Sequence, residues 1–184
     1  MAFLKRPRVV LGLLAVALLA AAAGYAEVAA EYDVKAAFLY NFTKFVEWPS
    51  AALTDDRGAL RLCVLGEDPF GRSLQEVASE EIAARKLTLL RAARLNDPAA
   101  CQVLFISRTE RRRLPALLAA VRDEPVLTVA DTEGFLEQGG IINFVLDGSR
   151  VRFEINQEAA QRAGLKISSK LMRLASRVIP GPDD

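Results

Sequence analysis

The sequence predicts an α/β fold: a single domain with a mixed sheet of about five to six strands, helices on both faces, and an antiparallel hairpin in the C-terminal half. Three observations support this prediction. Short apolar runs rich in Val, Ile and Leu alternate with segments of helical period. Residues 101–106 are apolar enough for a central strand. Two strand-like segments flank Asp147-Gly148-Ser149, which is a strong hairpin signal.

The first predicted helix covers residues 31–47. Its apolar residues recur at intervals of three and four, on one face of a helix: Val34, Phe38, Phe42 and Phe45, widened by Leu39 and Val46. Trp48-Pro49 ends this helix, because the residue before a proline is pushed out of the helical conformation. So many aromatic residues predict a helix that is largely buried against the sheet.

The strands are predicted from short apolar or alternating runs bounded by turn residues. In chain order they are Leu60–Leu65, Lys86–Leu90, Cys101–Ile106, Val126–Val129, and the two hairpin strands Ile141–Leu146 and Arg150–Ile155. In the last strand apolar and polar residues alternate, so one face packs and the other meets solvent.

Short helices are predicted between and after the strands, at Arg72–Glu80, Leu114–Arg122, Gly134–Gln138, Gln157–Ala163 and Ser169–Val178. Pro115 fits the first turn of the second of these helices. An earlier start at Ser107, with Glu110 completing a capping box, would place that proline inside the helix, so we favour the later start. Gly164 separates the last two helices.

The N-terminal segment predicts export from the cytoplasm. Met1–Arg8 holds three basic residues and no acid, and Val9–Ala23 is apolar over 15 residues. That run is shorter than the roughly 18–20 residues that cross a bilayer, so the layout is that of a signal peptide. We predict a signal peptide over residues 1–26, cleaved after Ala26, and one domain over residues 27–184. An uncleaved N-terminal anchor is the alternative.

The composition narrows the function. The chain has no histidine, which excludes Ser-His-Asp and Cys-His catalysis in their usual forms and His-ligated zinc or copper. Three of the 24 basic residues lie in the predicted signal peptide. The rest of the chain then has 21 basic and 23 acidic residues, which gives it a net charge of −2. A nearly neutral domain has no field to attract nucleic acid. This inventory points to no catalytic residue, cofactor or metal and is better suited to binding than to chemistry; a periplasmic enzyme is the third hypothesis, after the two given below.

Cys63 and Cys101 are the two cysteines of the chain. In an oxidising compartment two cysteines most simply form one disulfide, and both lie beside predicted strands. Closing this loop of 38 residues would stabilise the fold by about 4 kcal/mol. Two free buried thiols are the alternative.

Gly66–Ser73 has the spacing of a phosphate-binding loop between a strand and a helix. Its chemistry argues against that role, because Glu67 and Asp68 would place carboxylates where phosphate oxygens must lie, and Pro69 lacks a backbone donor. We therefore interpret the segment as a turn.

Two basic groups are candidate partner surfaces. The first clusters where a predicted strand meets a helix: Arg108, Arg111, Arg112 and Arg113. The second recurs at helical spacing and predicts a stripe along the last helix: Lys166, Lys170, Arg173 and Arg177. Each is either a solvated face or a surface for an acidic protein; the first also fits an anionic cell-wall polymer.

Seven blocks carry a family resemblance, and the first reads YDVKAAFLYNFTKFVEWP. In order they are residues 32–49, 62–66, 101–107, 126–129, 139–144, 151–156 and 163–171. They span nearly the whole chain after the predicted signal peptide. Together they resemble the YfiR-like family of periplasmic regulators.

The resemblance implies a periplasmic protein that represses an inner-membrane diguanylate cyclase by protein contact, affecting cyclic-di-GMP and biofilm formation. The implied partners are the periplasmic domain of that cyclase or of a sensor kinase, and an outer-membrane lipoprotein that relieves repression. A homodimer is a further candidate assembly. Cys63 and Cys101 match the family's disulfide that supports folding. The second cysteine pair of the best-known member has no counterpart here, so we expect no redox switch.

A second hypothesis is a module that binds a small molecule or cell-wall fragment for a sensor or transporter. Ligands of α/β sheets sit beyond the carboxyl ends of the strands. The loops Gly66–Gly71 and Ala130–Gly134 would then form the rim of the site.

Overall fold

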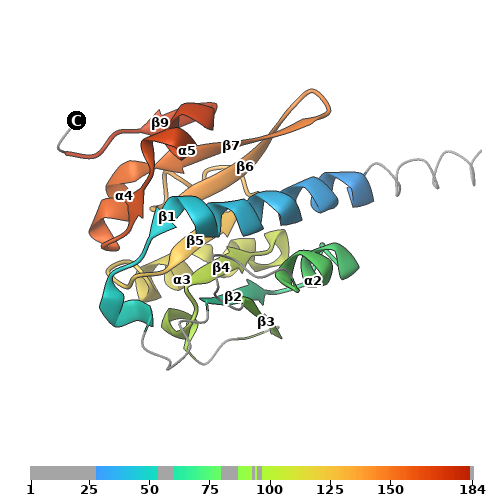
Figure 1. Cartoon of the computed structure of the whole chain (residues 1–184), viewed down its shortest axis with the longest axis horizontal. Helices are drawn as coiled ribbons and strands as arrows, with labels where there is room; N and C mark the ends of the chain where they lie inside the picture. The colour runs from blue at the N-terminus through green and yellow to red at the C-terminus, as the bar shows by residue number, and fades with distance from the viewer. Residues whose placement is uncertain (1–27, 54–59, 80–86, 93, 95–96, 183–184) are drawn as a thin grey trace, which may run out of the picture.

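The computed structural model describes residues 28–53, 60–79, 87–92, 94 and 97–182. They form a seven-stranded sheet in the order β3-β2-β4-β5-β6-β7-β9, which confirms the predicted mixed α/β fold with one strand more than expected (Figure 1). The strands are β2 (Leu60–Leu65), β3 (Leu87–Ala92), β4 (Val103–Ile106), β5 (Leu127–Ala130), β6 (Ile142–Asp147), β7 (Arg150–Asn156) and β9 (Arg177–Ile179). A two-stranded antiparallel sheet joins β1 (Val46–Glu47) to β8 (Lys166–Ile167).

The sheet is parallel from β3 to β6 and antiparallel between β6 and β7. The chain starts at β2, adds β3 on one side, and then continues with β4, β5 and β6 on the other. This reversal is the switch point at which doubly wound domains commonly bind ligands, beyond the carboxyl ends of the strands.

Helices cover both faces of the sheet, as predicted. The N-terminal helix (residues 28–45) packs on one face together with α2 (Arg72–Ala78), α4 (Gln157–Arg162) and α5 (Ser169–Leu174). The opposite face is covered by α3 (Leu114–Ala120) and the turn over residues 133–139. Short 3-10 segments complete the fold: η1 (Ser50–Leu53), η2 (Pro98–Ala100) and η3 (Arg108–Arg113).

The predicted disulfide is confirmed. Cys63 and Cys101 are bonded, with Cα atoms 6.0 Å apart, and both are fully buried in the layer beneath α3. Cys63 points to this layer because its neighbours Leu62 and Val64 face the N-terminal helix, as the alternation of a strand requires.

The last predicted helix is the main error in the elements. It ends at Leu174, and the following residues form β9, which pairs with β7. The backbone N–H and the hydroxyl of Ser176 both donate to the carbonyl of Phe153, which draws the chain to the sheet. The β-branched residues Val178 and Ile179 then continue the ladder, so pairing overrides the helical spacing.

Three smaller predictions also changed. Pro115 lies in the first turn of α3, as expected. The alternative start at Ser107 also corresponds to a helical segment, because the Ser107 side chain caps η3. Residues 134–138 form hydrogen-bonded turns rather than a helix. In the N-terminal helix Val34 is exposed, whereas Lys35 is buried. No helix of the described segments is long and apolar enough to span a bilayer; the predicted signal peptide lies outside those segments.

Candidate functional site

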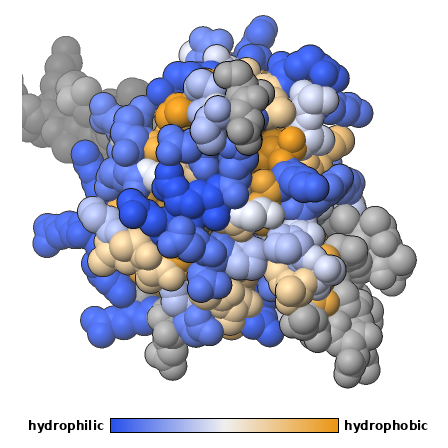
Figure 2. All heavy atoms as spheres, turned by 90° about the vertical axis from the view of Figure 1, so that its left-hand side faces the viewer, coloured by the Kyte–Doolittle hydropathy of each residue, from blue (hydrophilic) through white to orange (hydrophobic). Residues whose placement is uncertain are grey.

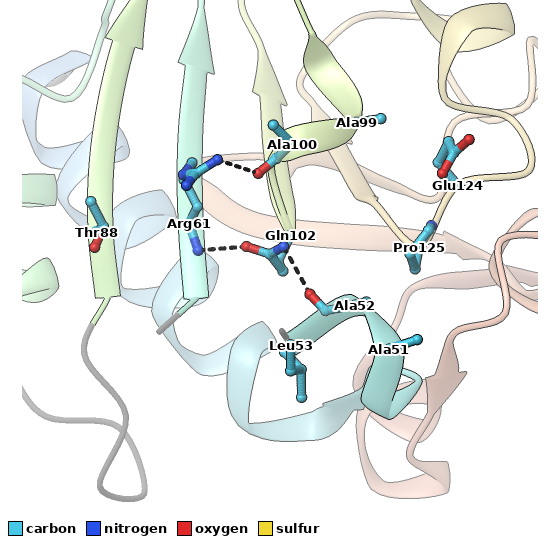
Figure 3. Close-up of a pocket in the computed structure, with 10 residues that line it drawn as sticks. All are labelled: Ala51, Ala52, Leu53, Arg61, Thr88, Ala99, Ala100, Gln102, Glu124 and Pro125. Carbon is cyan, nitrogen blue, oxygen red and sulfur yellow. Dashed lines mark hydrogen bonds between the residues drawn. The ribbon is translucent and has the colours of Figure 1, made fainter. Parts of the chain in front are cut away.

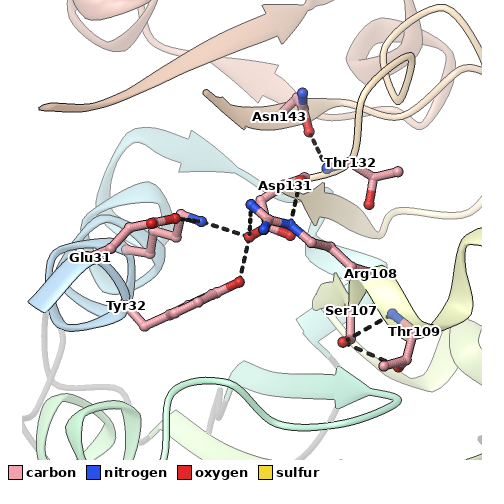
Figure 4. A network of polar contacts seen from close by, with 9 residues as sticks. Glu31, Tyr32, Ser107, Arg108, Thr109, Asp131, Thr132 and Asn143 are labelled. Carbon is pink, nitrogen blue, oxygen red and sulfur yellow. Dashed lines mark hydrogen bonds and ion pairs between the residues drawn. The ribbon is translucent and has the colours of Figure 1, made fainter. Parts of the chain in front are cut away.

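Asp131 is the centre of a buried polar network at the carboxyl end of β5 (Figure 4). Its Oδ2 accepts hydrogen bonds from the Tyr32 hydroxyl at 2.7 Å and the Lys35 ammonium at 2.6 Å. The Arg108 guanidinium, at the end of β4, lies 3.1 Å from the same oxygen and donates through Nε to the Asp131 carbonyl at 3.0 Å. The network therefore joins the N-terminal helix to the ends of two neighbouring strands.

The charges of this network are largely desolvated. The side chains of Lys35 and Asp131 are each 1% exposed, and Glu31 forms a second ion pair with Lys35. Burial and the hydrogen bond to Asp131 raise the pKa of Tyr32 above its ordinary value, so the hydroxyl stays protonated and donates. Asp131 Oδ1 is buried and has no hydrogen-bond partner in the described part of the chain. The arrangement is suited to holding the helix in place.

The switch point between β2 and β4 is filled by the protein itself. Gly66, just after β2, has φ +91°, and a Cβ there would lie 2.6 Å from Thr109 Oγ1 and 2.9 Å from Glu110 Cγ. The backbone N–H of Glu67 also donates to Thr109 Oγ1 at 3.2 Å. The loop therefore packs directly on the start of η3.

The first turns of the N-terminal helix close the same end of the sheet. The Tyr32 ring packs edge-on against Phe70 with centroids 5.4 Å apart, and Asp33 accepts a hydrogen bond from the Ser73 hydroxyl in α2. Asp68 accepts from the Phe70 backbone N–H at 2.8 Å, which is the turn that the sequence indicated in place of a phosphate loop. The predicted rim loop Gly66–Gly71 thus packs against the chain's own helix through Phe70, which is buried, while Glu67 and Gly71 stay exposed.

A cavity of about 550 Å³ lies beside this network, beyond β5 and β6. It includes part of the second predicted rim loop, through Asp131, Glu133 and Gly134. On its other side Arg177 pairs with Glu137 and Glu154, with N–O distances of 2.9 Å for both pairs. The hydrogen bonds that Arg177 donates to Glu154 and Glu137 raise the pKa of Arg177. The pKa of Glu137 is lowered by its own backbone N–H and by Arg177.

A second cavity, of about 360 Å³, opens at the amino ends of the parallel strands (Figure 3). Its polar groups bind one another: Arg61 donates from Nη1 to the Ala100 carbonyl at 2.9 Å and from its backbone N–H to Gln102 Oε1 at 2.8 Å. Gln102 Nε2 donates to the Ala52 carbonyl at 3.1 Å. The space-filling view of this end shows mostly hydrophilic residues with small apolar patches between them (Figure 2). These satisfied groups serve the fold and give a ligand few partners.

The structure does not place the predicted basic stripe on one helix. Lys166 lies in β8 and Arg177 in β9, so α5 carries only Lys170 and Arg173. Lys170 Nζ lies 5.3 Å from the centroid of the Phe45 ring, and Arg177 is engaged with two carboxylates. The predicted stripe along one helix is wrong because β9 replaces the second half of the predicted helix.

The predicted arginine cluster stays together on η3 but its members have different roles. Arg108 holds Asp131, and Arg113 pairs with Glu110 at 2.8 Å. Arg111 and Arg112 are exposed and form no ion pair within the described residues. Only these two are free for an acidic partner.

Sequence reasoning missed Lys35 and Asp131. A signal was present, because Lys35 lies four residues before Leu39 and seven before Phe42, in the series that forms the buried face of the helix. A lysine in such a series requires a buried carboxylate as a partner. The sequence does not indicate which acid, since Asp131 is 96 residues away.

Comparison with known proteins gives a family and remote structural likenesses. A family profile described as YfiR/HmsC-like matches residues 32–176. A conserved domain protein from Vibrio cholerae is 14% identical, with a TM-score of 0.46 over 64% of this chain and 54% of that one. An ABC domain from Streptococcus pneumoniae, in complex with L-Trp, is 15% identical, with a TM-score of 0.47 over 70% of this chain and 57% of that one. This chain thus matches a little over half the length of each structure.

Proposed function

This chain belongs to the YfiR/HmsC-like family, and we propose on that premise that it represses an inner-membrane diguanylate cyclase, or a related membrane sensor, by binding its periplasmic domain. At the level of the family, it is a periplasmic regulator of cyclic-di-GMP signalling, and the family's members are regulators rather than enzymes. The repression of a cyclase by this particular chain is the step that we add.

The proposal includes export and processing. We propose that residues 1–26 direct the chain across the inner membrane and are removed after Ala26, which leaves residues 27–184 in the periplasm. The buried disulfide between Cys63 and Cys101 supports this location, because disulfides persist in oxidising compartments and are rare in the cytoplasm.

The observation that carries the proposal is that the chain's own residues pack together at the switch point between β2 and β4. Gly66 packs against Thr109, and Tyr32 packs against Phe70, where a doubly wound domain commonly holds its ligand. A fold that fills this crevice with its own side chains is better suited to acting through its outer surface. Repression then requires only that the protein bind the inactive arrangement of the cyclase more tightly than the active one.

Deletion of the gene tests this proposal. We expect cyclic-di-GMP to rise in the deletion strain and to return to its original level when the full chain is restored. A matched control restores residues 27–184 without the leader, which should leave the cyclase unrepressed. Unchanged cyclic-di-GMP in the deletion strain, with every cyclase intact, would contradict the proposal.

The cavity of about 550 Å³ beside Asp131 favours one alternative, a module that binds a small molecule or cell-wall fragment. A thermal-shift screen of residues 27–184 with metabolites and cell-wall fragments tests it. Stabilisation by one compound, lost on Glu133→Gln in the cavity wall, would support this alternative. No stabilisation by any compound would argue against it.

A further inference from the structure

The outer half of the β6–β7 hairpin forms an arm that projects beyond the sheet, above the first turns of the N-terminal helix (Figure 1). β5 pairs with β6 only at Ile142 and Asn143, and β9 pairs with β7 only at residues 154–156. Residues 144–147 and 150–153 therefore have only each other as ladder partners. A two-stranded ribbon in water is marginally stable alone, so this arm depends on what packs against its faces.

One face of the arm continues the hydrophobic core outward. Phe144 and Phe153 lie opposite each other and pack against Phe38 of the N-terminal helix, with centroids 6.1 and 5.5 Å from its ring. Leu146 and Val151 form the next pair on the same face. The apolar surface thus extends beyond the point where the helix covers it.

The helix and the arm leave an apolar groove between them. Its volume is about 530 Å³, and its walls include Val34 and Phe38 from the helix and Leu146 and Val151 from the arm. Val34 is 45% exposed and Leu146 is 52% exposed. Exposed large apolar side chains that gather in one hollow are typical of a protein interaction site.

The exposed charges at the rim of the groove are mainly positive. Arg150 and Arg152 line it and are exposed, and neither forms an ion pair with another described residue. Glu31 also lines the groove, but its side chain is mostly buried and pairs with Lys35. A partner that fits this site presents apolar side chains flanked by carboxylates.

We propose that this groove is the docking site for an acidic amphipathic helix of the membrane partner's periplasmic domain. The inference rests on the proposed function and adds the surface that carries it. Apolar residues on one face of the partner helix enter between Val34 and Leu146, as in other complexes that seat a helix in a groove. Carboxylates beside them meet Arg150 and Arg152, which speeds association and fixes the register.

The test measures binding of residues 27–184 to the purified periplasmic domains of the membrane diguanylate cyclases encoded in the same genome. Leu146→Asp should weaken the binding by about tenfold or more, because it places a charge in the centre of the contact. Leu174→Asp is the matched control, since Leu174 is 55% exposed on α5, outside the groove lining, and should change affinity less than about twofold. Both variants should keep the thermal stability of the parent.

A second pair of variants tests the rim. Arg150→Glu with Arg152→Glu should slow association at low salt, and the difference from the parent should shrink at high salt. Equal binding by the parent and Leu146→Asp would overturn the groove while leaving the proposed function intact. A parent that binds no cyclase domain, with unchanged cyclic-di-GMP on deletion, would overturn both. A dimer of the chain that Leu146→Asp dissociates would instead assign the groove to self-association and overturn this inference.

Discussion

Asp131→Asn should strongly destabilise the domain. The substitution keeps the size of the side chain but removes the negative charge that Lys35 and Tyr32 contact in the interior. Lys35 is 1% exposed, so its ammonium cannot turn to water without moving the N-terminal helix. The helix is the element most affected, because this network holds its first turns to the sheet.

The expected loss is about 3 kcal/mol of unfolding free energy. Removing one partner of a buried ion pair costs about 3–5 kcal/mol, and the remaining ion pair between Lys35 and Glu31 places this case at the lower end. For a domain of this size the melting temperature falls by about 2–4 °C per kcal/mol. Chemical denaturation of residues 27–184, with the disulfide intact, measures the loss.

A second substitution tests whether the loss comes from the unpaired charge of Lys35. Adding Lys35→Met to Asp131→Asn removes the stranded charge and should recover at least about 1 kcal/mol. Glu158→Gln is the control, since its pair with Arg162 is solvent-exposed, and it should cost less than about 0.5 kcal/mol. A loss below about 1 kcal/mol for Asp131→Asn, or additive effects in the double variant, would refute the role given to this network.

Three further predictions concern stability. Replacing Cys63 and Cys101 together by Ala should cost about 4 kcal/mol in denaturant unfolding, and the native disulfide should resist dithiothreitol until denaturant is added, because both cysteines are buried; rapid native reduction would contradict this. Gly66→Ala should cost at least about 1 kcal/mol more than Gly148→Ala, because both have positive φ but only Gly66 meets neighbouring atoms within 4 Å; equal losses would refute the crowding. Since folding raises the pKa of Tyr32, the contribution of Tyr32 to the unfolding free energy should be constant below about pH 10 and fall above it, so that above this pH the parent should lose stability more steeply than Tyr32→Phe; parallel profiles would contradict the shift.

Local patterns predicted most of the fold. The hairpin followed from alternation around Asp147-Gly148-Ser149, and the central strands followed from short apolar runs. The disulfide followed from compartment and cysteine number. These features depend on neighbours in the sequence or on composition, so they can be deduced without three-dimensional information.

The features that failed depend on contacts between distant segments. Ser176 bonds to Phe153, and this contact turns a helical pattern into β9. Lys35 can be buried because it pairs with Asp131 at the end of β5. The groove beside Leu146 arises from the divergence of a helix and a hairpin that are about a hundred residues apart. The sequence pattern of either element alone does not indicate how far apart the helix and the hairpin lie in space.

The long separation between Lys35 and Asp131 also has a consequence for biogenesis. Chain entering the periplasm from its N-terminus must deliver residue 131 before the first helix can be anchored. Until then the helix over residues 28–45 lacks the carboxylate that its buried Lys35 contacts. Docking of this helix is therefore a late step of folding, although the helix comes first in the sequence.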